Sequence, residues 1–291
     1  MIATLVLAAL QAAIPAQGPP GTDIWVADLR VRDGHVSVGK PLNVTARTGY
    51  DNQPAFLPDG SGFLYTRIGA DGQADIWRYD VATHTSRAVT TTRESEYSPT
   101  FVPKSGGISV VRVELDSTQR LWRLDPDGSH PALLFEKIKP VGYHAWAGDS
   151  TLALYVLGNP NALVLAKLGS ERFDTVARNI GRALQPIPGR HAVSFVQIVD
   201  STESWLTELN ADSGTVHRLV RLPRGAEFHV WIPGGLVLTS DGASLYQWDP
   251  KGAATWAAVA DLGALGLQGG TRLAVNTAGD RLALVARDPG P

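Results

Sequence analysis

Residues Asp51–Thr90 read DNQPAFLPDGSGFLYTRIGADGQADIWRYDVATHTSRAVT, and this stretch decides the fold. It contains four short apolar runs, each closed by turn residues such as Pro58-Asp59-Gly60 or Gly69-Ala70-Asp71-Gly72. Proline fixes φ and glycine accepts a positive φ, so these segments predict tight connections between strands. The run Asp75–Asp80 alternates apolar and polar residues, which is the period of a half-buried strand. The stretch therefore predicts one sheet of four hairpin-connected strands.

The same pattern recurs along the chain at a spacing of 41 to 45 residues. With Phe56 as the reference position, the equivalent residues are Phe101, Trp146, Ile187, Trp231 and Val275. A turn and an apolar run follow each of them. This spacing matches the roughly 40–45 residues of a four-stranded propeller blade. We therefore predict an all-β fold, a six-bladed β-propeller with four-stranded blades.

The two ends of the chain each supply part of one repeat. The last copy, from about Gln268 to Arg287, has only two strands, whereas Asp23–Asp28 nearly copies Asp75–Asp80 and precedes a fourth-strand candidate at His35–Thr45. We expect N-terminal and C-terminal strands to pair in one blade, because this closes the ring and removes exposed sheet edges. The expected single domain spans 22–287, with blades near 51–92, 96–137, 141–178, 182–221 and 226–261, and a last blade built from 268–287 plus 22–46.

Two short motifs carry a resemblance to a known family. They are Asn52-x-Pro54-x-Phe56-x-Pro58-Asp59-Gly60 and Asp75-Ile76-Trp77-x-x-Asp80. They resemble the TolB-type β-propeller repeat, the Pro-Asp relative of the WD repeat. The resemblance implies a six-bladed propeller of the kind usually found in secreted or periplasmic bacterial proteins, most of them non-enzymatic platforms for protein partners. It carries over no catalytic residue, and it implies no role in the Tol system, because the α/β domain that precedes the TolB propeller is absent here.

Composition and the first residues limit the partners and the location. The chain has 291 residues, a formal net charge of −2 and no cysteine. It therefore has no basic footprint for nucleic acid, no disulfide and no thiolate metal site. The apolar run Met1–Ala16 predicts a signal peptide over 1–17, although no Lys or Arg precedes it; a misassigned start codon or an N-terminal anchor is the alternative. We expect a periplasmic or secreted monomer with no transmembrane domain in the mature chain.

The first strand of each blade lines the central channel of a propeller, so its polar residues are candidates for a small-molecule site. Two positions before each reference residue, the repeats carry Pro54, Pro99, His144, Gln185, His229 and Leu273. His144, Gln185 and His229 could converge on one divalent ion or on a substrate, because imidazole is the commonest ligand of such ions. The alternative is that each is hydrogen-bonded to backbone in a filled channel.

Charged residues stand at the predicted starts of the same strands. Asp51, Glu96 and Glu227, with Arg182 among them, are expected to form a charged rim at one channel mouth. A carboxylate rim can bind a cation or a basic partner. The alternative is that these residues are solvated loop ends.

The sequence contains no catalytic signature. It has no G-x-S-x-G elbow, no phosphate-binding P-loop and no calcium-binding loop. We therefore predict a non-enzymatic, exported platform in the bacterial envelope, without a cofactor, that binds a protein at its rim loops or another ligand. The alternative is a metal-dependent enzyme of the lactonase or lyase kind, or a small-ligand binder, that uses His144, Gln185 and His229 in the channel.

Overall fold

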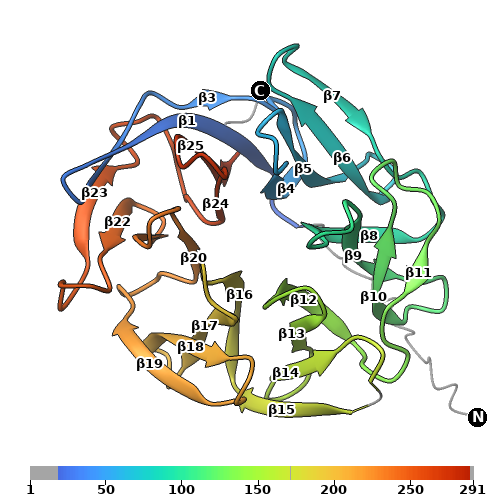
Figure 1. Cartoon of the computed structure of the whole chain (residues 1–291). Helices are drawn as coiled ribbons and strands as arrows, with labels where there is room; N and C mark the ends of the chain where they lie inside the picture. The colour runs from blue at the N-terminus through green and yellow to red at the C-terminus, as the bar shows by residue number, and fades with distance from the viewer. Residues whose placement is uncertain (1–18, 171, 289–291) are drawn as a thin grey trace, which may run out of the picture.

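The computed structural model describes residues 19–170 and 172–288. Within them every regular element is a β-strand, and Figure 1 shows the strands grouped into sheets around a common centre. None of these described residues belongs to a helix long and apolar enough to cross a membrane. The expected signal peptide over 1–17 lies outside the described residues.

Four separate antiparallel sheets follow one another between residues 95 and 261, each with four strands. They are β8 (Ser95–Phe101), β9 (Ile108–Val113), β10 (Gln119–Leu124) and β11 (Ala132–Leu133); β12 (Val141–Trp146), β13 (Thr151–Val156), β14 (Ala162–Lys167) and β15 (Phe173–Arg178); β16 (Ile180–Pro186), β17 (Ala192–Ile198), β18 (Ser204–Asn210) and β19 (Val216–Arg221); and β20 (Phe228–Trp231), β21 (Val237–Ser240), β22 (Ser244–Trp248) and β23 (Ala257–Asp261).

The remaining strands form one nine-stranded sheet that has two parts. The first part is β4 (Tyr50–Phe56), β5 (Gly62–Ile68), β6 (Ala74–Asp80) and β7 (Thr85–Ala88). The second part is β24 (Leu273–Val275), β25 (Arg281–Arg287) and β1 (Thr22–Arg32), with β2 (His35–Val38) and β3 (Leu42–Asn43) paired to β1. A single parallel pair, Thr22 with Tyr50, joins the two parts.

Strand β1 pairs with β25 although the two lie at opposite ends of the sequence. The antiparallel register runs from Thr22 opposite Arg287 to Asp28 opposite Arg281. The expected fourth strand at His35–Thr45 is instead divided into β2 and β3, and each pairs with a different half of β1. Pro41 lies between these two strands, and proline interrupts a ladder because it has no N–H to donate.

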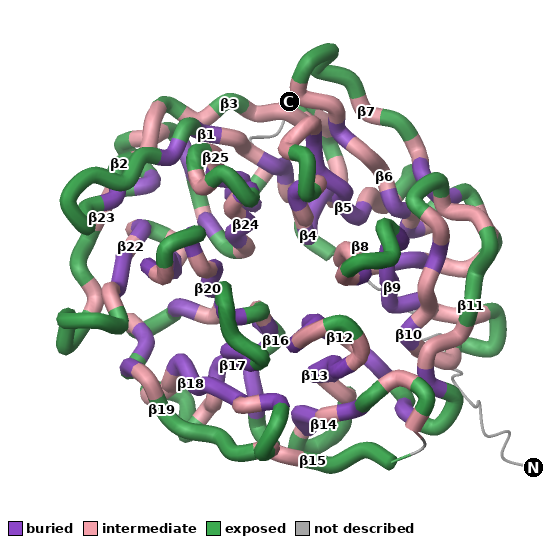
Figure 2. Tube along the Cα trace, in the orientation of Figure 1, coloured by how far each residue is buried: buried purple, intermediate pink, exposed green. Residues whose placement is uncertain are grey.

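The strands nearest the centre are β4, β8, β12, β16, β20 and β24 (Figure 1), and each contacts the next one along the chain. Strand β24 also contacts β4. The hydrophobic core lies between neighbouring groups of strands. For example, Ile24 and Val285 pack against Phe63 and Tyr65. Figure 2 shows buried residues along the inner strands and the strands next to them, and exposed ones on the outer strands and loops.

The register shows that the reference position chosen for the fourth repeat is one residue too late. Pro186 pairs with Val193 as Phe56 pairs with Phe63. The amide of Ile187 donates to the carbonyl of Ala192, the first residue of β17. In the same way, the amide of Leu57 donates to the carbonyl of Gly62, the first residue of β5. Pro186 is therefore the equivalent of Phe56. Consequently Leu184, not Gln185, stands two positions before the reference residue.

The burial of β1 predicts a contrast between two substitutions on this strand. Ile24 is completely buried, whereas Val31 is 42% exposed. We expect Ile24→Ala to lower the free energy of unfolding by about 2–5 kcal/mol, because it opens a cavity where the two parts of the nine-stranded sheet pack together. Val31→Ala, the control, should change it by less than about 0.5 kcal/mol. Urea denaturation measures both values, and equal effects would contradict a structural role for the buried face of β1.

Candidate functional site

A cavity of about 370 Å³ lies among the inner strands, and we call it the channel cavity. Residues of β4, β8, β12, β16, β20 and β24 all contribute to its wall. One level of the wall, two positions before the reference residues, consists of Pro54, Pro99, His144, Leu184, His229 and Leu273. Gln185 also lines the cavity, but it does not share the register position of the two histidines.

His144 is held by a serine of the neighbouring sheet. Its Nε2 lies 2.7 Å from Ser109 Oγ, and Trp146 Nε1 donates to the same oxygen over 2.9 Å. Ser109 belongs to β9, whereas His144 and Trp146 belong to β12. We call this contact between sheets a serine bridge.

A second serine bridge repeats the first one two sheets further on. His229 Nε2 lies 2.7 Å from Ser194 Oγ, and Trp231 Nε1 donates to Ser194 over 2.8 Å. In both bridges the serine precedes the histidine by 35 residues. Sequence reasoning selected the histidines but missed the serines. The equal spacing of the two Ser–His–Trp sets was the signal that identifies them.

Three polar side-chain atoms in the cavity wall are buried without a hydrogen-bond partner in the structure. They are His144 Nδ1, His229 Nδ1 and Ser98 Oγ. Burial lowers the pKa of both imidazoles from 6.5 to about 3, so both rings are neutral at neutral pH. Each Nε2 is occupied by a serine, and each Nδ1 is buried just beneath the cavity surface without a hydrogen-bond partner among the described residues.

The β4 and β8 side of the cavity contains two residues in the left-handed backbone region. Gln53 has φ 60° and Ser98 has φ 54°, and both lie where the strand register shifts. Gln53 Oε1 accepts hydrogen bonds from Thr66 Oγ1 at 2.6 Å and from the Ser98 amide at 2.8 Å. Non-glycine residues in this region cost about 1–3 kcal/mol each and persist only where their surroundings hold them. The Gln53 side chain supplies that restraint between the two strands.

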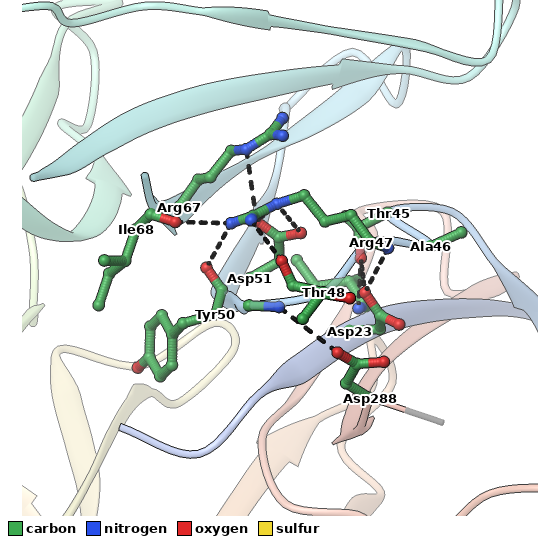
Figure 3. A network of polar contacts seen from close by, with 12 residues as sticks. Asp23, Thr45, Ala46, Arg47, Thr48, Tyr50, Asp51, Arg67, Ile68 and Asp288 are labelled. Carbon is green, nitrogen blue, oxygen red and sulfur yellow. Dashed lines mark hydrogen bonds and ion pairs between the residues drawn. The ribbon is translucent and has the colours of Figure 1, made fainter. Parts of the chain in front are cut away.

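The charged rim expected at the channel mouth is not assembled as predicted, because Asp51 and Glu96 are fully buried. Figure 3 shows Asp51 enclosed by Arg47 and Arg67. Arg47 Nε lies 3.0 Å from Asp51 Oδ2, and Arg47 also donates to the carbonyls of Tyr50 and Ile68. Burial raises the pKa of Asp51, and the two arginines oppose that shift. Asp51 therefore stabilises the junction before β4 instead of facing a ligand.

Glu96 has equivalent surroundings in the next sheet. Arg112 lies 3.1 Å from Glu96, and the guanidinium of Arg112 lies 5.0 Å from the ring centre of Trp122. The same order of carboxylate, arginine and tryptophan occurs on β4, β5 and β6, as Asp51, Arg67 and Trp77. The guanidinium of Arg67 lies 4.2 Å from the ring centre of Trp77. Burial raises the pKa of Glu96 as well. Both carboxylates are parts of ion pairs within their own sheets.

Arg182 and Glu227, in contrast, are brought together at the mouth. Arg182 Nε and Nη2 donate to the two carboxylate oxygens of Glu227 over 2.5 and 2.7 Å. This bidentate pair joins β16 to the residue before β20. Arg272 lines the same end of the cavity, and the sequence analysis did not select it.

The three predicted metal ligands, His144, Gln185 and His229, stand on three successive inner strands. His144 and His229 stand on β12 and β20, with β16 between them, and each directs Nε2 to a serine. Within residues 19–170 and 172–288, no group of three or more His, Asp or Glu residues could hold a metal ion. A site of the predicted kind would depend on the two Nδ1 atoms and the amide of Gln185.

Comparison with known proteins identifies the fold. No protein-family model matches the chain, and no curated protein matches it in sequence. Among solved structures, a TolB-type protein from Agrobacterium tumefaciens matches 94% of this chain and 100% of its own, with a TM-score of 0.73 and 17% identity. An oligogalacturonate lyase in complex with manganese matches 87% of this chain and 82% of its own, with a TM-score of 0.59 and 14% identity.

A gluconolactonase from Xanthomonas campestris is similar as well. The match covers 94% of this chain and 99% of that one, with a TM-score of 0.63 and 10% identity. The chain thus has a TolB-like β-propeller fold. Because these similar proteins include a lyase and a lactonase, the fold alone does not determine the function.

The buried histidines predict that the protein loses stability in acid. Their folded-state pKa of about 3 lies below the ordinary value of 6.5, so the unfolded chain binds more protons between these two values. Above pH 6.5 the two histidines do not destabilise the folded state. Between pH 6.5 and pH 3, each histidine lowers the free energy of unfolding by on the order of 1 kcal/mol for each pH unit that the pH falls. We expect the free energy of unfolding to depend less steeply on pH in the His144→Gln, His229→Gln double variant.

The measurement is a series of urea denaturations from pH 7 to pH 4 in wild type and variants. His35→Gln, on an exposed part of β2, is the control and should leave the slope unchanged. Comparing slopes removes the opposite contribution of Asp51 and Glu96, whose raised pKa values favour the folded state in acid. An unchanged slope in the double variant would contradict the buried, neutral state of both rings.

Proposed function

We propose that this chain is a six-bladed, ring-closed β-propeller that acts as an exported, non-enzymatic binding protein and holds its ligand in the channel cavity. Six groups of strands and the pairing of β1 with β25 support the blade count and the closure. The apolar segment at 1–17 supports export to the periplasm or beyond the cell.

The observation that carries the proposal is the set of unpartnered polar atoms in the cavity wall. They belong to His144, His229 and Ser98, residues of three different strands that line one cavity, so a small side-chain movement would bring each atom to the cavity surface. A buried polar group without a partner costs about 1–3 kcal/mol. A ligand that supplies these hydrogen bonds recovers that free energy. The cavity volume is also within the usual range for small-molecule sites.

The serine bridges do not have the features of a catalytic pair. Ser109 and Ser194 are fully buried, and each already accepts a hydrogen bond from a tryptophan. In a serine hydrolase a carboxylate orients the second ring nitrogen of the histidine, whereas here each Nδ1 has no partner in the structure. The bridge also occurs twice in one chain, which favours a structural role in joining neighbouring sheets. These features support binding over hydrolysis.

Protein binding at the rim loops is part of the same proposal. The propeller scaffold leaves its loops exposed at both faces, and exposed loops on a rigid scaffold commonly bind partners. The identity of the partner is open. We propose that the mature chain is monomeric, since its terminal strands are already paired with each other.

We expect that filling the cavity abolishes ligand binding. A fragment library of neutral, anionic and cationic compounds can be screened by ¹H–¹⁵N NMR, with the indole N–H signals of Trp146 and Trp231 as reporters. Both indoles contact the cavity wall through the serine bridges. Ala55→Trp should remove the shifts of these signals, because Ala55 lines the cavity and the larger side chain occupies it. The melting temperature shows whether the variant is folded.

The matched control is Ala82→Trp, which places the same side chain in an exposed turn. It should retain binding. Fragments that shift the two indole signals equally in wild type and Ala55→Trp would contradict the channel as the binding site, and so would a library in which no compound shifts them.

The second candidate is a metal-dependent enzyme that uses the channel. The two unpartnered Nδ1 atoms favour it, and the similar structures include a manganese-bound lyase and a gluconolactonase. Elemental analysis of protein purified without chelator separates the candidates. We expect well below one divalent ion per chain. One ion per chain that disappears in the His144→Ala, His229→Ala double variant, but not in His35→Ala, would favour the enzyme.

A further inference from the structure

The side chain of Arg272 extends across the channel mouth. Arg272 precedes β24, yet its guanidinium carbon lies 4.3 Å from the ring centre of Phe228 and 4.7 Å from that of Tyr143. Phe228 begins β20, and Tyr143 belongs to β12. Figure 1 shows β12 and β24 on opposite sides of the centre. The guanidinium is thus held by aromatic rings from two other sheets.

The charge of Arg272 has no counter-ion among residues 19–170 and 172–288. The cavity wall contains two arginines and two histidines but no Asp or Glu. Arg182 is neutralised by its bidentate pair with Glu227, and the two buried histidines are neutral. No carboxylate of the described residues forms an ion pair with Arg272. The mouth of the cavity therefore carries one uncompensated positive charge.

The way in which Arg272 is held leaves its hydrogen-bond donors available. A guanidinium that stacks on an aromatic ring keeps its five N–H groups in its own plane, directed away from that ring. No side-chain hydrogen bond of Arg272 occurs within the described residues. Tyr50, outside the cavity lining, is near enough to interact electrostatically with Arg272 and Arg182, and burial raises its pKa to about 12, so it adds no negative charge near Arg272.

The wall beyond Arg272 is largely apolar. Pro54, Pro99, Leu184 and Leu273 share the next level with the two neutral histidines, and Phe56, Phe101 and Val275 lie further along the inner strands. A molecule that fits this cavity combines an apolar body with an anionic end. The volume of about 370 Å³ suits one or two rings and excludes a polymer chain as a fully enclosed ligand.

We propose that the channel cavity binds a small carboxylate with an apolar body, whose carboxylate accepts two hydrogen bonds from Arg272. This inference rests on the proposed function of the channel as a binding site. A planar carboxylate matches the planar fork of a guanidinium, and such charge-assisted pairs are about twice as strong as neutral hydrogen bonds. The aromatic rings of Phe228 and Tyr143 hold the fork in place before the ligand arrives.

The test uses two probes that differ in charge, 2-naphthoate and 2-naphthamide. Titration calorimetry of the whole protein should show naphthoate binding about tenfold or more tightly, because only the acid forms a charge-assisted pair. Arg272→Gln should lower the naphthoate affinity to that of naphthamide. Arg218→Gln is the matched control, since Arg218 also lies over a tryptophan, 5.3 Å from the ring of Trp205, but on the outer strand β19. Arg218→Gln should leave the preference for naphthoate over naphthamide unchanged.

The indole signals of Trp146 and Trp231 distinguish the two ways in which the test can fail. If both probes shift them with equal affinity, or if Arg272→Gln keeps the preference for naphthoate, the anion inference is wrong while the channel remains a binding site. If neither probe shifts them, both the inference and the channel site are contradicted.

Discussion

Seven residue pairs between β1 and β25 hold the beginning of the described chain against its end. This pairing positions β24, whose one strand partner within the described residues is β25. Strand β24 in turn contacts β20 on one side and β4 on the other. The residues that precede and begin β24, Arg272 and Leu273, therefore reach the channel because two ends of the sequence have met. Local turns build each sheet, but this long-range contact places the inner strands around one cavity.

Two kinds of contact then hold neighbouring sheets in register. Apolar clusters lie between all neighbouring groups of strands, and they are non-directional. The serine bridges are directional, because Ser109 and Ser194 each bind a ring nitrogen and an indole N–H of the next sheet. By occupying Nε2, each bridge also fixes the plane of its imidazole. The same contact that joins two sheets thus determines which nitrogen remains unpartnered.

The sequence predicts the sheets well because turn residues and alternating strands are local signals. Its errors have physical causes. The reference position of the fourth repeat was placed at Ile187, one residue too late, because both Pro186 and Ile187 are apolar residues just before the turn. The strand pairing of Pro186 with Val193 decides between them. Asp51 and Glu96 were predicted to form a charged rim at the channel mouth, but each is paired with an arginine of the next strand, Arg67 or Arg112, which the spacing of the repeats does not reveal.

Arg272 was missed for a different reason. Its contacts with Tyr143 and Phe228 join residues from three sheets, and no repeat pattern encodes a contact of that kind. Repeats reveal what the copies share, so they direct attention away from residues that occur once. The unpartnered nitrogens of His144 and His229 likewise follow from three-dimensional contacts with serines that the sequence analysis passed over.

The distribution of the wall residues breaks the rotational symmetry that a repeated fold would otherwise give its channel. His144 and His229 flank Leu184, whereas Pro54, Pro99 and Leu273 form the rest of that level. A wall of identical residues would accept a guest in several equivalent rotations about the axis. Among the described residues, both imidazoles of the wall lie in one sector, and Arg272 carries the one charge of the wall that is not paired with a carboxylate. The wall that a guest would meet therefore differs from one side of the channel to the other, although the strands that form it come from one repeated pattern.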